Sequence, residues 1–388
     1  MSEQDPEVGH LFGSTAAWAL DDDVVHTNHG SFGGITTATL EAVEAARRDV
    51  AANPMRGYDR EWFDHHARAV AAVAGLVGAR PEDTTLVPNA TVGMDVALRV
   101  LPWDPDTTIV CTDVAYPSVA ANLVRRAAAT GATIEVLATD PAIPEALPTM
   151  VAAALDRVGQ DGPTGVVVDQ FVSATATPLP VHDVVAAAHA RGAVVVVDGA
   201  HVPGQVAPDR ADVGADAWTG NLHKWACAPP ALAALVVAER HHDRLGSVVS
   251  SWFDDEPFPG NSRWQGTVDP GPVLVAEQVV AQAVAILARA DELEARARAG
   301  AEAVAEAVGG EVLPGAGWMR AVVLPDSAGP ADDAGRRAIE RGLWTRGIEA
   351  KVTPDHGRLV LRISTHAYTS DRDHDRLADV LGRQLGDA

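Results

Sequence analysis

One short stretch decides the fold, Val194-Val195-Val196-Val197-Asp198-Gly199-Ala200-His201. A continuous run of β-branched residues is typical of a strand that a parallel sheet buries on both faces. Open α/β sheets bind their ligands at the carboxyl ends of such strands. The stretch therefore predicts a buried parallel strand that delivers Asp198 to a ligand-binding edge.

A lysine follows this acid in the stretch Gly220-Asn221-Leu222-His223-Lys224-Trp225. An aspartate at a strand tip and a lysine shortly downstream form the pair that pyridoxal phosphate (PLP) chemistry requires. The lysine holds the cofactor as a Schiff base, and the carboxylate keeps the pyridine nitrogen protonated so that the ring accepts electrons. We therefore predict a PLP site with Lys224 as the covalent attachment point and Asp198 at the ring nitrogen.

Apolar runs alternate with amphipathic segments over roughly residues 80–240. This alternation predicts an α/β fold with a mainly parallel sheet and all ligand residues on one edge. A long Ala-rich segment, residues 273–308, then leads into further strands at 321–324 and 358–363, which predict a smaller α+β domain. A short helix is expected at residues 15–20.

Domain boundaries are expected after residues 30 and 270. They would separate an N-terminal arm (1–30), a large PLP-binding domain (31–270) and a small C-terminal domain (271–388).

The composition excludes several classes of function. The 388 residues carry a formal net charge of -23, so nucleic acid and anionic membranes are poor partners. Cys111 and Cys227 are too few for a disulfide framework or a zinc site, and the adjacent His65 and His66 would not share a helix face, so no metal site is predicted. The polar N-terminus and the lack of long apolar runs predict a soluble, cytoplasmic protein.

Six motifs, spread in order over nearly the whole chain, carry a family resemblance. They are Asn28-His29-Gly30-Ser31-Phe32-Gly33, Pro88-Asn89-Ala90-Thr91, Asp198-Gly199-Ala200-His201, Gly220-Asn221-Leu222-His223-Lys224-Trp225, Gln265-Gly266-Thr267 and Arg362-Ile363-Ser364. Together they resemble fold-type-I PLP enzymes of the class V aminotransferase family. The resembled branch is the isopenicillin N epimerase-like one, which also contains carbon–sulfur lyases. The resemblance implies a sheet of the seven-stranded type in the large domain.

The cofactor contacts follow from the residues and from this resemblance. A helix that starts near Ala90 and Thr91 offers amide groups and a hydroxyl to the phosphate. Ser173 and Thr175 are candidates for the cofactor's phenolic oxygen or the substrate, with a plain Ser/Thr turn as the alternative. The contacts that the resemblance implies are Tyr116 stacked on the ring, Ala200 on its opposite face, His201 at the phenolic oxygen, Asn221, and Gly266 with Thr267 donated by the second subunit of a homodimer.

Substrate and catalytic roles complete the predicted site. The resemblance puts Asn28 and His29 at the mouth of the site and Arg362 on the substrate α-carboxylate, for which a guanidinium fork is well shaped. Lys224, once released, is the natural base for the Cα proton, with His223 or Tyr116 assisting the transfer.

The reaction itself remains open among several Cα reactions of an amino-acid-type substrate. The first choice is β-elimination from an S-conjugated cysteine in specialised metabolism, and the second is epimerisation. Decarboxylation and aminotransfer remain as further alternatives, as does a PLP-fold protein that binds without turnover. A cysteine desulfurase is disfavoured because residues 325–335 contain no cysteine to accept sulfur. Trp225, Trp252 and Trp264 suggest a pocket larger than a bare amino acid needs, although core packing explains them equally well.

Overall fold

The computed structural model describes residues 9–159 and 162–386. The chain divides into two compact units. The large unit comprises Thr39–Val172 and Leu179–Ala281, and the small unit comprises Met1–Ala38, Ser173–Pro178 and Gln282–Ala388. The N-terminal residues and the short segment Ser173–Pro178 thus belong to the same unit as the C-terminal part of the chain.

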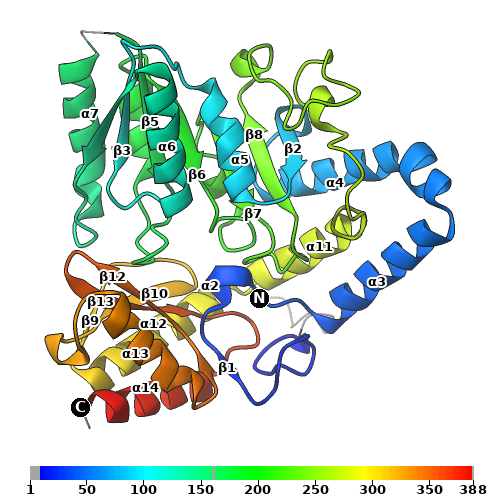
Figure 1. Ribbon diagram of the computed structural model, residues 1–388. Helices are drawn as coiled ribbons and strands as arrows, with labels where there is room; N and C mark the ends of the chain where they lie inside the picture. Colours follow the sequence, from blue (N-terminus) through cyan, green and yellow to red (C-terminus); the bar gives the residue numbers. More distant parts are fainter. Residues whose placement is uncertain (1–8, 160–161, 387–388) are drawn as a thin grey trace. The chain divides into compact units, whose positions relative to one another are not determined.

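The large unit is built on a seven-stranded sheet with the order β2-β8-β7-β6-β5-β3-β4 (Figure 1). Its strands are β2 (Thr84–Val87), β3 (Thr108–Thr112), β4 (Thr133–Leu137), β5 (Thr164–Asp169), β6 (Val194–Asp198), β7 (Ala217–Asn221) and β8 (Ala233–Val237). Only β8 runs antiparallel to its neighbours, β2 and β7. The predicted mainly parallel α/β sheet is confirmed.

The valine run forms β6 at the centre of this sheet. Val195, Val196 and Val197 are 0% exposed, as expected for a strand that is covered on both faces. The parallel register pairs Asp198 of β6 with Asp169 of β5, so two strands end in neighbouring acids.

Helices precede and follow these strands along the chain. They are α3 (Thr37–Ala52), α4 (Trp62–Leu76), α5 (Ala90–Ala97), α6 (Pro117–Thr130), α7 (Leu147–Val158), α8 (Val181–His189), α9 (Pro208–Ala211), α10 (Gly271–Leu274) and α11 (Ala276–Leu287). Helix α5 packs closely against β7, because a Cβ atom at Gly93 would lie 2.1 Å from Oγ1 of Thr219. The missing side chain thus lets the start of α5 approach the carboxyl end of the sheet.

The small unit has an antiparallel sheet with the order β12-β13-β10-β9. Its strands are β9 (Glu311–Val312), β10 (Met319–Val323), β12 (Lys351–Asp355) and β13 (Arg358–Ser364), and its helices include α2 (His29–Phe32), α12 (Ala290–Val308), α13 (Asp333–Trp344) and α14 (Asp371–Gly386). Near the start of the chain, β1 (Val25–His26) pairs in parallel with β11 (Ile348–Glu349). This pairing ties the N-terminal residues to the C-terminal part of the chain.

The helix predicted at residues 15–20 is wrong. Trp18 instead forms a bridge with Thr36 and is 3% exposed, and its indole N–H donates to the carbonyl of Leu11. Burying a tryptophan with a satisfied N–H outweighs the weak helical preference of a six-residue segment.

A buried histidine in α4 makes the large unit sensitive to acid. His66 is 7% exposed and lines a pocket of ≈ 100 Å³, and burial lowers its pKa from 6.5 to about 4. Between these two pH values the unfolded chain binds a proton that the folded chain does not bind, so the free energy of unfolding falls as the pH falls from 6.5 to 4.

We expect His66→Leu to reduce this loss of unfolding free energy between pH 7 and pH 4 by about 3 kcal/mol, measured by urea unfolding at the two pH values. If His66→Leu lost as much unfolding free energy at low pH as the parent protein and the His65→Leu control, this role of His66 would be contradicted.

Candidate active site

Lys224 is a buried lysine held next to a histidine. Its Nζ lies 3.0 Å from Nε2 of His201, and the indole N–H of Trp225 donates to Nδ1 of the same imidazole at 3.3 Å. An indole N–H can only donate, so Nδ1 is an acceptor and the proton of the neutral ring sits on Nε2. The contact between Nε2 and Nζ positions the amine of Lys224, whose neutral form is nucleophilic and basic.

The sequence offers few alternatives to this lysine. The 388 residues contain two lysines, and the second, Lys351, contacts the buried carboxylate of Glu340 at 3.3 Å in the small unit. Lys224 is therefore the buried lysine of the two, and His201 positions its amine.

Two carboxylates stand side by side at the carboxyl edge of the large sheet. Asp198 accepts from the N–H of Ala200 at 2.9 Å, and Asp169 accepts from the N–H of Tyr116 at 3.4 Å. Burial, and then the neighbouring Asp198, raise the pKa of Asp169 well above its usual range. Burial also raises the pKa of Asp198, while the Ala200 amide and Lys224 oppose the shift. A protonated nitrogen placed against Asp198 would stabilise its charged form.

The start of α5 lies at the same edge of the sheet, and side chains accept from two of its first backbone N–H groups. The N–H of Ala90 donates to Oδ1 of Asn221 at 2.8 Å, and the N–H of Val92 donates to the capping side chain of Asn89 at 3.0 Å. Thr91 lies between these satisfied amides and is exposed, so its hydroxyl and amide are the groups that can face an anion. Asn221 thus supports this turn through Ala90.

Three other predicted site residues belong to the large unit. Tyr116 precedes α6 and is 42% exposed. Ala200 is half-buried beside Asp198. His223 is half-buried as well, and burial lowers its pKa from 6.5 to about 4, which keeps the imidazole neutral near neutral pH.

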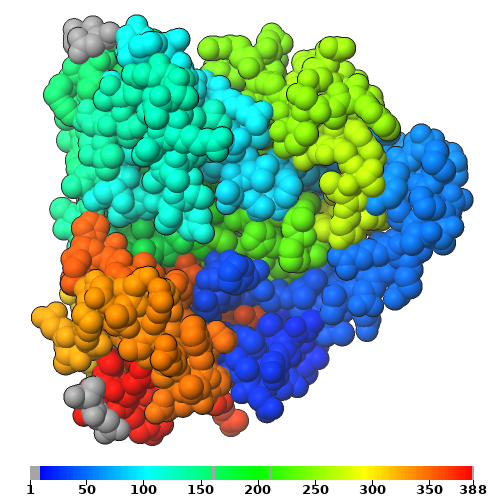
Figure 2. All heavy atoms as spheres, viewed as in Figure 1, coloured from blue at the N-terminus to red at the C-terminus, as the bar shows by residue number. Residues whose placement is uncertain are grey.

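The loop segment after β8 carries the predicted phosphate donors of the second subunit. It forms the lime-coloured surface of the large unit in Figure 2. Gly266 has a φ of 93°, and Thr267 is exposed. In the same segment Trp252 is 79% exposed and stacks on Trp264, with ring centroids 5.3 Å apart.

In the small unit, four oxygen atoms surround the guanidinium of Arg362. Nη1 donates to the carbonyl of Ser173 at 2.6 Å and to its hydroxyl at 3.2 Å. Nη2 donates to Oδ1 of Asn28 at 3.0 Å and to the hydroxyl of Ser31 at 2.7 Å. The structure therefore brings Asn28, Ser173 and Arg362 together, although they are far apart in the sequence. The hydroxyl of Thr175 lies 2.9 Å from that of Thr177.

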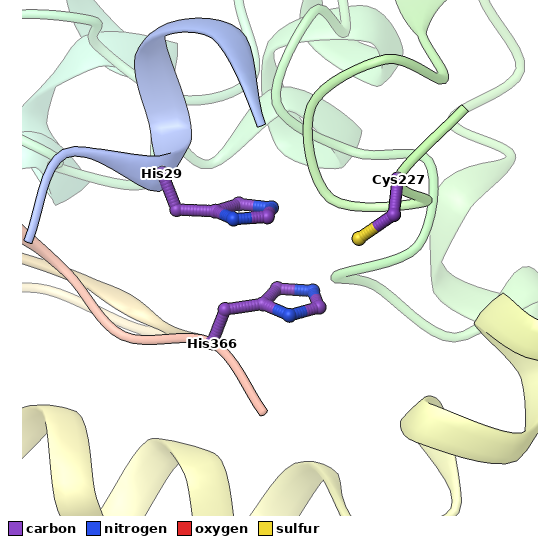
Figure 3. Close-up of side chains that lie close together, drawn as sticks. All are labelled: His29, Cys227 and His366. Atoms are coloured by element: carbon purple, nitrogen blue, oxygen red, sulfur yellow. The ribbon is translucent and has the colours of Figure 1, made fainter. Parts of the chain in front are cut away.

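His29 has a defined tautomer in the same unit. The N–H of Gly34 donates to its Nδ1 at 3.2 Å, so this nitrogen is an acceptor and the hydroxyl of Tyr368 also donates to it, at 2.9 Å. The neutral ring therefore carries its proton on Nε2. Figure 3 shows the His29 ring stacked on that of His366, with centroids 4.0 Å apart, and it also labels Cys227, a residue of the large unit.

Two residues of these clusters were not predicted from the sequence. Asp169 ends a valine-rich strand as Asp198 does, so the same signal was present in the sequence. Ser31 lies inside a quoted motif, but no local signal connects it with Arg362 because their contact spans 331 residues.

The groups at the edge of the large sheet suit PLP chemically. Lys224 offers a buried amine for a covalent bond, Asp198 a carboxylate for a protonated ring nitrogen, and Thr91 a helix start for a phosphate. A mainly parallel seven-stranded sheet with such a lysine and aspartate defines the class of fold-type-I PLP enzymes.

Comparisons with known proteins agree with this class. A family model described as aminotransferase class-V matches residues 35–251. Isopenicillin N epimerase of Streptomyces clavuligerus is 31% identical over 95% of this chain and 96% of its own length. A putative L-cysteine desulfhydrase of Oryza sativa subsp. japonica is 32% identical over 66% of this chain and 56% of its own length. Among solved structures, a C-DES mutant with glycine covalently linked to the PLP cofactor has a similar fold, with a TM-score of 0.79 at 19% identity, over 96% of this chain and 98% of that one.

The chain belongs to the class V aminotransferase family and is a PLP-dependent enzyme related to an epimerase and to cysteine desulfhydrases. The family and cofactor predictions are thereby confirmed. Within residues 9–159 and 162–386, no helix is both long and apolar enough to cross a membrane.

Proposed function

We propose that this enzyme is a carbon–sulfur β-lyase that acts on an S-conjugated cysteine-type amino acid. The Cα proton is removed, the Cβ–S bond breaks, sulfur leaves as a thiolate, and the released three-carbon product hydrolyses to pyruvate and ammonia. PLP, when bound, supplies the electron sink for this chemistry. The relation to L-cysteine desulfhydrases supports carbon–sulfur cleavage.

Each side chain of the proposed site has a defined task. Lys224 holds the cofactor and, once released, takes the Cα proton as a neutral amine. Asp198 holds the proton on the ring nitrogen, and His201 donates from Nε2 to the phenolic oxygen of the cofactor. Arg362 binds the substrate carboxylate through its guanidinium fork. Gly266 and Thr267 reach the phosphate of a second copy in a homodimer, so sedimentation of the enzyme as a single chain would exclude that part of the proposal.

The supply of bases in the large unit is the observation that carries the choice of reaction. Elimination needs one base at Cα, whereas epimerisation also needs an acid that returns a proton to the opposite face. Lys224 provides the base. His223, with a pKa lowered to about 4, is a poor proton donor near neutral pH, which leaves Tyr116 as the group that would have to act as the second acid.

The two cysteines support release of sulfur as a free thiol. Cys111 is 5% exposed, and burial is the main cause that raises its pKa to about 11. Cys227 is 0% exposed, and burial raises its pKa well above the usual range. Neither thiol is therefore available as the thiolate that accepts sulfur in a persulfide-forming desulfurase.

The direct test is product analysis with S-substituted cysteines in deuterated water. The proposal predicts pyruvate, ammonia and a free thiol in equal amounts. Deuterium at Cα of otherwise intact substrate with inverted configuration would instead establish epimerisation, the activity named for a relative that matches 95% of this chain. The absence of both outcomes with a loaded enzyme would contradict the proposed substrate class.

A substitution at Arg362 tests the carboxylate anchor. We expect Arg362→Ala to raise KM for carboxylate-bearing substrates by about 30-fold, equivalent to the loss of about 2 kcal/mol of charge-assisted hydrogen bonding, with a smaller change in kcat. Arg358→Ala, at the start of the same strand, is the matched control. An unchanged KM in Arg362→Ala would point to another anchor or to an amine without a carboxylate.

A further inference from the structure

The guanidinium of Arg362 is fully engaged by the protein on both terminal nitrogens. Nη1 and Nη2 each carry two hydrogens, and each has two acceptor oxygens within 3.2 Å. A substrate carboxylate that binds these two terminal nitrogens must therefore replace at least one protein oxygen. The identity of the oxygen that is displaced, and of those that remain bound, determines how the Arg362 guanidinium is held while the substrate carboxylate binds.

The contacts on Nη2 are tightly interlocked. The hydroxyl of Ser31 accepts from Nη2 at 2.7 Å and donates its single hydrogen to Oδ1 of Asn28, also at 2.7 Å. Oδ1 of Asn28 in turn accepts from Nη2 at 3.0 Å. Arginine only donates, so the amide oxygen of Asn28 must face it and the amide nitrogen must point away. Three side chains thus form a closed ring of hydrogen bonds.

The backbone holds Ser31 in this ring. Ser364 lies two residues after Arg362, on the same face of β13, because successive side chains alternate along a strand. Its N–H donates to the carbonyl of Thr27 at 2.8 Å, and its hydroxyl accepts from the N–H of Gly30 at 3.0 Å. The turn that carries Ser31 is therefore fastened to the strand that carries Arg362.

The contacts on Nη1 are less symmetrical. The carbonyl of Ser173 accepts at 2.6 Å, whereas its hydroxyl accepts at 3.2 Å, the longest of the four contacts. A hydroxyl can also rotate away without moving the backbone. It is therefore the oxygen that an incoming carboxylate displaces most easily.

We propose that Ser31 is a positioning residue for substrate binding: it locks Nη2 of Arg362 and the amide of Asn28, while the hydroxyl of Ser173 gives way to the substrate carboxylate. This inference rests on the proposed role of Arg362. Asn28, oriented by Ser31, presents its amide hydrogens as additional donors for the bound molecule.

The test measures the binding of a carboxylate that cannot react. Calorimetry with 3-(methylsulfanyl)propanoate, which lacks the amino group, reports the anchor on the PLP-loaded enzyme without turnover. We expect Ser31→Ala to raise its Kd about five- to ten-fold, and Ser31→Thr, which keeps the hydroxyl, to restore it to within about two-fold. Ser173→Ala is expected to leave the Kd unchanged or to lower it. The affinity for 2-(methylsulfanyl)ethanamine, which has no carboxylate, should not respond to Ser31→Ala.

Three results would overturn the proposal in distinguishable ways. An unchanged Kd in Ser31→Ala, together with weaker binding in Arg362→Ala, would show that the anchor works without Ser31. An equal rise in Kd for Ser173→Ala would remove the division of roles between the two serines. An unchanged Kd in Arg362→Ala would show that the proposed carboxylate anchor itself is wrong.

Discussion

Replacing Lys224 by alanine is expected to remove both the covalent attachment of the cofactor and the base for the Cα proton. The purified Lys224→Ala variant should lose the visible absorbance of the lysine-bound cofactor. Its kcat on any amino-acid substrate should fall by at least about 10³-fold, because the loss of a positioned base and of covalent catalysis combine. Absorbance spectra and initial rates measure both effects.

Lys351→Ala is the matched control, since it removes the other lysine of the chain. Lys351 contacts Glu340, and its loss should leave the cofactor absorbance in place. A visible band that survives in Lys224→Ala and disappears in Lys351→Ala would mean that the wrong lysine carries the cofactor.

Replacing Asp198 by asparagine is the second change with a large expected effect. An amide cannot hold the proton on the ring nitrogen as a carboxylate does, so the ring accepts electrons less readily. We expect kcat to fall by about 10²–10³-fold with a smaller change in KM, as for other losses of preorganised electrostatic stabilisation.

The neighbouring acid offers a stringent comparison. Asp169 pairs in register with Asp198, and burial together with the neighbouring Asp198 raises the pKa of Asp169 well above its usual range, which favours its neutral acid form. Asp169→Asn keeps a neutral side chain of similar shape and should reduce kcat much less than Asp198→Asn. Equal losses in the two variants would contradict the assignment of Asp198 as the partner of the ring nitrogen.

The centre of the fold was predictable from local sequence. Four valines that end in Asp198 mark a buried parallel strand, and in the structure they form the central strand of the large sheet. Lys224 was predictable because the chemistry demands a lysine downstream of such an acid. In both cases the signal lies within a few residues and depends on burial or on a chemical requirement, which sequence patterns express well.

The remaining features depend on contacts between distant segments. The pairing of Asp169 with Asp198 follows from strand register, which a valine run does not specify by itself. The contact of Ser173 with Arg362 spans 189 residues, so no periodic pattern in the sequence predicts it. The helix prediction around Trp18 failed for the same reason, because the buried bridge that Trp18 forms with Thr36 outweighs the local helix propensity of the segment.

The most direct measurement is the location of the cofactor on the chain. Reduction of the PLP-loaded enzyme with borohydride fixes the cofactor on its lysine, and peptide mass spectrometry then identifies that lysine. The chain has two, so the experiment has two possible positive outcomes. Labelling of the peptide that contains Lys224 is the predicted result. Labelling of the Lys351 peptide, or the absence of any label on an enzyme that turns over amino acids, would contradict the proposed site.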